Sequence, residues 1–349
     1  MAHSHGAPIG PYGASKTPPK SLRIPFLLPP IDTCLRGGLA CGLVTELCGP
    51  PGASKTSLAI SLLHSCVTRG VTPAAGPAAF PQPASSSSSS SSSGSDALVI
   101  NTESRPTFMA RIKNVFAQQD VLHMLDHVHV ADSSCSKVAT PSGAVTALIN
   151  ALTQAQTLIR QRARTKHARP IRLVVVDSVA MALGDTSTSD EEAAAARNQP
   201  RSLQTHWRVA DLLKQIARDE TGAPPVAVLV TNHVADAPSY AALAASPSLR
   251  AAVASKCGGG RVGGFEVQAH AGAYGVSRVV PALGLFWSQC VHVRLFVHRC
   301  APDENAENAN ANENTLPLWE MHVAFAPHLP QDAVCRYTPT EISNRMKAK

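Results

Sequence analysis

The sequence predicts an α/β fold in which a mostly parallel, twisted sheet carries helices on both faces and ends in an antiparallel edge. Two observations lead to this fold class. Short apolar runs rich in Val, Leu and Ile alternate with longer segments of helical periodicity, which is typical of parallel strands buried on both sides. Further along the chain, apolar residues recur at every second position, as in antiparallel strands with one polar face.

Four apolar runs supply the expected parallel strands. They are Leu43–Cys48, Ala97–Asn101, Ile171–Val176 and Val226–Thr231. The first run precedes a helix expected at Thr56–Ser65, where Ala59, Leu62 and Leu63 share one face. Two alternating segments, Val291–Val297 and Trp319–Phe325, are expected to pair as the antiparallel edge.

Three stretches are too rich in small, polar or helix-breaking residues to join a packed core. They are residues 1–20, residues 71–95 with the serine run Ser85–Ser93, and residues 303–314, which alternate Asn, Ala and Glu. The expected organisation is therefore a disordered tail at 1–20 and one domain at 21–349 with flexible insertions at 71–95 and 303–314.

Composition narrows the class of protein. The chain has 349 residues and a formal net charge of +7, but only 16% of its residues are charged, so the excess of positive charge reflects a shortage of acids. No apolar run reaches the roughly 18 residues of a transmembrane helix, and the first thirty residues lack the apolar block of a signal peptide. Nine cysteines without a C-x-x-C pair are expected to be reduced thiols of a protein inside the cell.

A phosphate-binding loop is expected directly after the first strand. Residues Gly49-Pro50-Pro51-Gly52-Ala53-Ser54-Lys55-Thr56 match G-x-x-x-x-G-K-[ST], except that Ser54 replaces the second glycine. In such a loop, backbone N–H groups and the helix N-terminus face an anion, Lys55 reaches the outer phosphates, and the Thr56 hydroxyl ligates Mg²⁺. Ser57 extends the expected nucleotide-binding set. The alternative is an ordinary Gly/Pro turn before a helix, and a Cβ at residue 54 would crowd phosphates or force an unfavourable backbone angle.

Two acidic residues follow strands of the same sheet. Asp177 ends the run Leu173–Val176, where a carboxylate can hold a water on Mg²⁺, and Glu103 follows the second strand, where it can orient and deprotonate an attacking water. The alternatives are a capping residue for Asp177 and a surface acid for Glu103. Lys55 and Glu103 are the expected catalytic residues, and Thr56 and Asp177 the expected metal-binding residues.

The order of these motifs resembles the RecA-type recombinases of eukaryotes, and among them the recombinase paralogues, over residues 31–343. The segments that carry the resemblance are Leu35-Arg36-Gly37-Gly38-Leu39, Gly42–Gly49, Asn101-Thr102-Glu103, Leu173–Ser178, Leu229–Asn232, Pro281–Gly284 and Ala326–Pro330. Within the family, three segments resemble most the X-ray-repair cross-complementing subgroup of type three: Leu35–Leu39, Pro281–Leu285 and Ala326–Pro330.

The resemblance implies a RecA-like P-loop ATPase core that uses ATP and Mg²⁺. It further implies a nuclear protein that binds DNA in homologous recombination and double-strand break repair. Such a protein would assist the main recombinase filament on single-stranded or branched DNA, in a hetero-complex with another paralogue. The alternative is a non-catalytic scaffold subunit in which bound ATP only stabilises an interface; turnover is expected to be weak.

The resemblance also assigns residues. Asn232 stands where the family has a polar nucleotide sensor, and Pro327–Pro330 would cap the nucleotide of a neighbouring subunit. His233 occupies a position that is often glutamine in the recombinases, so it is either a relay between ATP and DNA or a plain histidine at a strand end.

Two DNA-facing loops follow from the resemblance. The first, residues 185–200, is acidic at Asp190, Glu191 and Glu192, which repels phosphate. The second, residues 235–274, places Arg250, Lys256 and Arg261 among glycines and is the expected DNA-binding segment, unless it is only a disordered connection. The densest basic run, Arg160–Arg172, is either a solvated helix end or an accessory surface for DNA or a partner.

Overall fold

A computed structural model describes residues 22–73, 94–103, 107–133, 141–184, 200–218, 223–236, 279–283, 287–300, 318–330 and 333–338. The expected tail at 1–20, the insertion at 303–314, the acidic loop and the residues Arg250, Lys256 and Arg261 lie outside these ranges. The predicted insertion at 71–95 is described only at its two ends, and there it is ordered in part, because Thr72 and Pro73 form a short strand.

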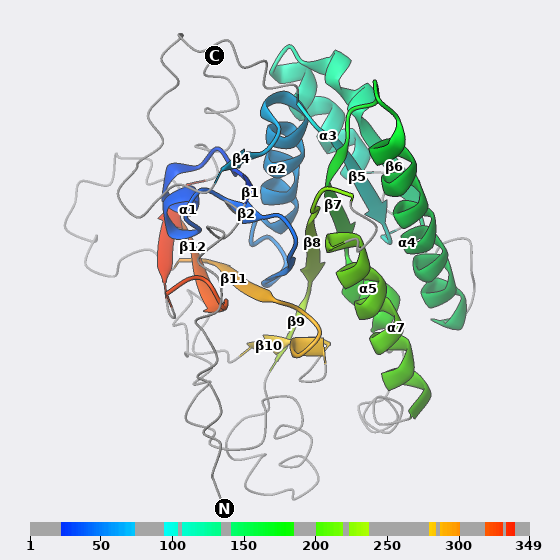
Figure 1. The fold of residues 1–349 in the computed structure, drawn as a ribbon. Helices are drawn as coiled ribbons and strands as arrows, with labels where there is room; N and C mark the ends of the chain where they lie inside the picture. The colour runs from blue at the N-terminus through cyan, green and yellow to red at the C-terminus, as the bar shows by residue number, and fades with distance from the viewer. Residues whose placement is uncertain are drawn as a thin grey trace, which may run out of the picture.

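One eight-stranded sheet forms the centre of the fold, in the order β13-β12-β11-β3-β8-β7-β5-β6 (Figure 1). Its parallel strands are β3 (Val44–Cys48), β5 (Asp96–Asn101), β6 (Val128–Asp132), β7 (Ile171–Asp177) and β8 (Ala227–Asn232). β11 (Val293–Arg299) continues the parallel order beside β3, and β12 (Trp319–Phe325) and β13 (Val334–Tyr337) pair antiparallel beyond it. The predicted α/β fold with an antiparallel edge is confirmed.

Helices cover both faces of this sheet, because successive residues of each buried strand point to opposite sides. One core cluster joins Leu173 and Val175 of β7 to α1 (Pro29–Cys34), α2 (Lys55–Arg69) and α3 (Thr107–Gln118). The other joins Val174 and Val176 to α4 (Pro141–Arg164), α5 (Val179–Leu183) and α7 (Pro200–Ala217). A 3₁₀ helix, η1 (Leu122–His127), precedes β6.

Two small antiparallel sheets flank the central one. β1 (Leu22–Ile24) pairs with both β2 (Leu39–Ala40) and β4 (Thr72–Pro73). β9 (Val234–Asp236) pairs with β10 (Val279–Pro281) just beyond the end of β8 (Figure 1). The β9–β10 ribbon pairs the start of the expected second DNA-facing loop, 235–274, with a strand that begins at residue 279, beyond the expected end of that loop.

The predicted strands agree with the observed ones to within one or two residues, whereas β6, β13 and the small sheets were not predicted. Among the described residues, none of the helices is both long and apolar enough to cross a membrane.

Candidate nucleotide site

The loop between β3 and α2 contains two residues with positive φ shortly before the helix. Gly52 has φ +78°, and Ser54, directly before the helix, has φ +65° and ψ 13°, which is the left-handed region. A Cβ on Gly52 would meet no other atom within 4 Å, so this part of the loop borders open space. The expected strain at Ser54 is therefore present in the backbone, because a side chain stands where glycine would be relaxed.

Two strands at the antiparallel edge of the sheet, β11 and β12, contact this loop. A Cβ on Gly49 would lie 2.2 Å from the carbonyl oxygen of Val297, so only glycine permits β11 to approach so closely. The indole Nε1 of Trp319 in β12 donates a hydrogen bond of 3.3 Å to the carbonyl oxygen of Gly52. Neither contact is visible in the loop motif, because the partners lie far away in the chain.

Lys55 is the first residue of α2, and its ammonium group closes onto the loop. Its Nζ donates to the carbonyl oxygens of Gly49, at 2.6 Å, and Pro50, at 3.0 Å. Burial lowers the pKa of Lys55, and the negative charges of Asp177 and Glu103 oppose that shift. Thr56 and Ser57 are partly buried beside it, and the Ser57 hydroxyl accepts a hydrogen bond from Arg111 of α3 at 2.9 Å.

Asp177 ends β7 and is 7% exposed. Its Oδ1 accepts a hydrogen bond from the hydroxyl of Thr231 in β8. Burial raises the pKa of Asp177 and the charge of Glu103 adds to this, while Thr231, Lys55 and His233 oppose it. The structure thus brings the predicted metal-binding carboxylate next to the predicted phosphate-binding lysine.

Thr102 fixes the turn that follows Asp177. Its backbone N–H donates to the Asp177 carbonyl oxygen at 2.9 Å, and its hydroxyl accepts a hydrogen bond from the Ser178 N–H at 2.8 Å. Sequence reasoning assigned no role to Thr102 or Thr231. The signal that both share is a threonine at the carboxyl end of a buried strand.

Glu103 follows β5 at the same edge of the sheet and meets a histidine. His233 Nε2 lies 3.5 Å from Glu103 Oε1, and the two side chains are 34% and 26% exposed. His233 directly precedes β9, so this contact connects the predicted water-activating carboxylate to the β9–β10 ribbon.

Asn232 is engaged in a different contact. Its amide nitrogen donates to Oε1 of the fully buried Glu46 at 2.6 Å, and Arg294 Nε donates to the other carboxylate oxygen at 2.6 Å. The expected sensor side chain is therefore part of a buried polar chain that crosses β8, β3 and β11. Its role toward a nucleotide remains a prediction.

The residues fit the nucleotide and metal that the fold implies. The ammonium of Lys55 is held by loop carbonyls at the position where phosphate oxygens would be its partners, and the loop is open at Gly52. Thr56 offers a hydroxyl and Asp177 a carboxylate, which are the oxygen ligands that Mg²⁺ prefers.

The predicted cap, Pro327–Pro330, is anchored from within this chain. Leu329 is buried in the core cluster beside α2, whereas Pro327 and Pro330 are exposed. Burial lowers the pKa of the neighbouring His328 to about 4, and the charges of Arg23 and Arg36 add to the effect. Contact of this turn with a second subunit stays a prediction.

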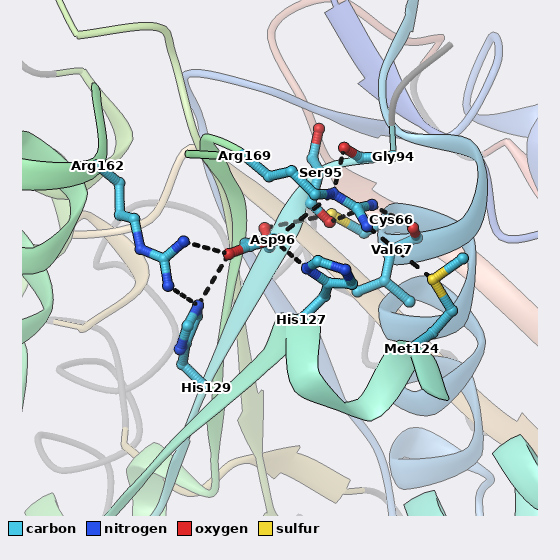
Figure 2. Close-up of polar contacts among 10 residues, drawn as sticks. All are labelled: Cys66, Val67, Gly94, Ser95, Asp96, Met124, His127, His129, Arg162 and Arg169. Carbon is cyan, nitrogen blue, oxygen red and sulfur yellow. Dashed lines mark hydrogen bonds and ion pairs between the residues drawn. The ribbon is translucent and has the colours of Figure 1, made fainter. Parts of the chain in front are cut away.

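The basic run at 160–172 is divided, since Arg164 and Lys166 are exposed at the helix end whereas two other arginines are not. Arg162 at the end of α4 and Arg169 after it point inward to Asp96, which is 1% exposed at the start of β5 (Figure 2). His127 and His129 contact the same carboxylate at 2.9 and 3.0 Å. Arg162 and Arg169 therefore have a structural partner at the amino end of β5, whereas contact of the exposed Arg164 and Lys166 with DNA or a partner stays a prediction.

Comparisons with known proteins bear on the whole arrangement. Residues 16–235 match the family model described as AAA domain. The chain is 23% identical over 312 residues to the DNA repair protein XRCC3 homolog of Arabidopsis thaliana, covering 86% of this chain and 85% of that protein. It is 27% identical over 329 residues to the DNA repair protein XRCC3 of Bos taurus, covering 92% of this chain and 74% of that protein. The chain therefore belongs to the AAA domain family, as a RecA-like paralogue similar to XRCC3.

Proposed function

We propose that this protein binds ATP with Mg²⁺ at residues 49–57 and acts on DNA in repair by homologous recombination. The observation that carries the proposal is the meeting of Lys55, Asp177 and Glu103 at the carboxyl ends of the parallel strands, where the two carboxylates raise the pKa of Lys55 against burial and Lys55 opposes the raised pKa of Asp177. The two relatives are described as DNA repair proteins, which supports the biological context.

Each side chain has a definite task in this proposal. Lys55 binds the outer phosphates in place of the loop carbonyls, Thr56 ligates the metal, and Asp177 accepts a hydrogen bond from a water on that metal. Mg²⁺ supplies charge neutralisation of the phosphates. Glu103 orients a water and accepts its proton on Oε1, the oxygen that lies 3.5 Å from His233.

Hydrolysis is slow in this scheme for two reasons. The Cβ of Ser54 stands in the loop where backbone should face phosphate, and the left-handed conformation adds strain. In addition, the contact with His233 occupies the carboxylate oxygen that must accept the proton of water.

DNA contact is assigned to Arg250, Lys256 and Arg261 of the loop that the β9–β10 ribbon closes. His233 at the foot of this ribbon would transmit the nucleotide state to the loop. We further propose a nuclear hetero-complex with another recombinase paralogue that assists the main recombinase on single-stranded or branched DNA at double-strand breaks, with Pro327–Pro330 capping the nucleotide of the neighbouring subunit.

The test of ATP dependence is Lys55→Ala, with Lys113→Ala as a matched control because Lys113 is an exposed lysine on α3. We expect Lys55→Ala to abolish nucleotide binding in a fluorescent-nucleotide titration and to fail in complementing repair in cells. Lys113→Ala should behave as the parent. Parent-like binding and complementation by Lys55→Ala would overturn the proposal.

A second candidate is a scaffold subunit in which ATP stabilises an interface without turnover. Two observations favour it: burial raises the pKa of Asp177, which weakens it as a metal-binding carboxylate, and Glu103 is paired with His233. Glu103→Gln separates the two candidates. Loss of ATP turnover and of repair in this variant supports the enzyme, whereas unchanged repair supports the scaffold.

A further inference from the structure

A cluster of metal-ligating side chains lies on the antiparallel edge, apart from the nucleotide site. It consists of His298 on β11 and of Glu320 and His322 on β12. Their neighbours Val297, Met321 and Val323 belong to the core beside α2, so the alternation of a strand turns the three polar side chains to the opposite face. The three side chains are only 13%, 11% and 15% exposed.

The backbone register of the two strands creates the cluster. His298 stands directly opposite Glu320, and His322 lies two residues further along β12 on the same face. Oε1 of Glu320 lies 2.5 Å from His322 Nε2 and 3.7 Å from His298 Nε2. The two imidazole rings are stacked, with centroids 5.3 Å apart and an interplanar angle of 24°.

A neighbouring residue fixes the carboxylate in this orientation. Arg336 of β13 donates from Nε to the other oxygen, Oε2, of Glu320 at 2.7 Å. Burial opposes ionisation of Glu320, but the hydrogen bonds from Arg336 and His322 outweigh it, so the pKa of the carboxyl is lowered. Oε1 is thereby presented as a negatively charged ligand atom between two imidazoles, an arrangement in which a carboxylate ligand is itself held by a hydrogen bond.

We propose that His298, Glu320 and His322 bind a divalent transition-metal ion, with Zn²⁺ as the best match. Two imidazole nitrogens and one carboxylate oxygen form a ligand set that suits Zn²⁺ and its neighbours and does not suit Mg²⁺ or Ca²⁺, which prefer oxygen alone. The candidate ligand atoms lie within 4.8 Å of one another, which is close enough for a common ion with bonds of roughly 2.0–2.2 Å after small side-chain rotations. Three protein ligands leave the fourth position of a tetrahedron to water.

Metal binding would replace the contact between His322 Nε2 and Glu320 Oε1. The metal would take the lone pair of the imidazole nitrogen and the charge of the carboxylate, and any proton on that nitrogen would leave to solvent.

A metal ion bound at this position would affect the strands that support the phosphate loop. β11 and β12 are the strands whose Val297 and Trp319 support Gly49 and Gly52 of the phosphate loop. An ion that ties β11 to β12 would therefore hold the support of the loop in place. This site is independent of the proposed ATP function, because none of its ligands belongs to residues 49–57, Glu103 or Asp177.

The test is zinc retention by the full-length protein. The parent is stripped with a chelator, incubated with a small excess of Zn²⁺ under reducing conditions, passed through a desalting column and assayed for bound metal. His322→Gln and Glu320→Gln remove one ligand each, and His167→Gln, an exposed histidine after α4, is the control for non-specific binding.

We expect the parent and His167→Gln to retain one more equivalent of zinc than either ligand variant. Zn²⁺ should also raise the thermal midpoint of the parent and of the control only, because an ion that binds the folded state alone stabilises it. Co²⁺ as a probe should give visible bands of a nitrogen–oxygen site in the parent that the ligand variants lack.

Equal zinc content and equal thermal shifts in parent, control and both ligand variants would overturn the proposal. The parent alone also decides the question if a variant fails to fold. A parent that shows no zinc-dependent thermal shift and no nitrogen–oxygen Co²⁺ spectrum has no such site.

Discussion

Ser54 is the residue at which this chain departs from the phosphate-binding loop motif, which has glycine at this position. Residues with a Cβ lose about 1 kcal/mol or more in the left-handed region, and the Ser54 side chain caps no helix N–H in return. The serine is therefore tolerated at a cost in the place where the motif has glycine.

We predict that Ser54→Gly is more stable than Ser54→Ala by about 1 kcal/mol, because alanine keeps the Cβ and the strain while glycine removes both. Ser54→Gly should also increase the rate of phosphate release from ATP. Chemical denaturation and a phosphate-release assay measure the two effects. Equal stability of the two variants would show that the positive φ costs nothing here.

Asp32 predicts a pH dependence of stability. It is 8% exposed and accepts a hydrogen bond from the Phe26 N–H at 2.6 Å, yet burial raises its pKa to about 6 from an ordinary value of 3.8. Because the folded state binds the proton more tightly, the stabilisation is complete below about pH 4 and is lost as the pH rises through 6.

We therefore expect the free energy of unfolding of the parent to fall, relative to Asp32→Asn, by about 2 kcal/mol between pH 4 and pH 7. Denaturant titrations of both proteins at several pH values measure this difference. Parallel pH profiles of the two proteins would mean that the Asp32 carboxyl ionises as readily in the folded as in the unfolded chain.

At the scale of elements, the group around Asp96 ties the amino ends of β5 and β6 to α4. Arg162 contacts Asp96 Oδ2 at 3.1 Å, and Arg169 lies 3.7 Å from Oδ1 (Figure 2). Arg169 also donates to the carbonyl oxygens of Gly94 and Val67, so one guanidinium joins the end of α2 to the start of β5. The sequence showed these residues only as a basic run, because the carboxylate that organises them is more than sixty residues away in the chain.

We predict that Asp96→Asn lowers the free energy of unfolding by about 2–4 kcal/mol, since it leaves two arginines and two histidines facing one another without a counter-charge. Asp126→Asn, on the exposed side of η1, is the control and should change stability by less than about 0.5 kcal/mol. Equal stabilities of the two variants in urea would contradict a structural role for the Asp96 contacts.

The predictable part of the fold consists of elements with strong local patterns. β3, β5, β7 and β8 are continuous apolar runs, and α2 follows a recognisable loop. β6 was missed because His129 and Asp132 interrupt its apolar pattern, and β13 because its four residues, VCRY, carry too little pattern to distinguish a strand from a turn. Short strands such as these are fixed by pairing with a neighbour rather than by their own sequence.

For the whole molecule, the domain organisation remains a prediction with a direct test. The central sheet uses strands from residues 44 to 337, so the insertions must leave and re-enter a single core. We expect replacement of residues 74–93 by a flexible linker of about eight residues to change stability by less than about 1 kcal/mol, because loop-closure entropy varies slowly with length. Calorimetry should show one cooperative transition, and loss of cooperativity would assign residues 74–93 a part in the core.

The candidate site, like the fold, has a part that could be predicted from the sequence and a part that could not. Lys55, Thr56, Asp177 and Glu103 could be predicted because a short motif and the carboxyl ends of parallel strands identify them. The contacts of Thr231 with Asp177, of His233 with Glu103 and of Trp319 with the loop could not be predicted. Each joins segments that are far apart in the chain and meet only in the folded structure.

The contact between Trp319 and Gly52 also has a consequence for the order in which the parts of the site are synthesised. These residues are 267 positions apart, so the ribosome makes the phosphate loop long before the indole that supports it. A growing chain that has released everything through β8 holds the loop, the lysine and both carboxylates, but not the strands beneath them. The phosphate loop thus gains its last support only after β12 is made, and a chain truncated after β11 keeps the motif and Val297 but lacks the indole of Trp319.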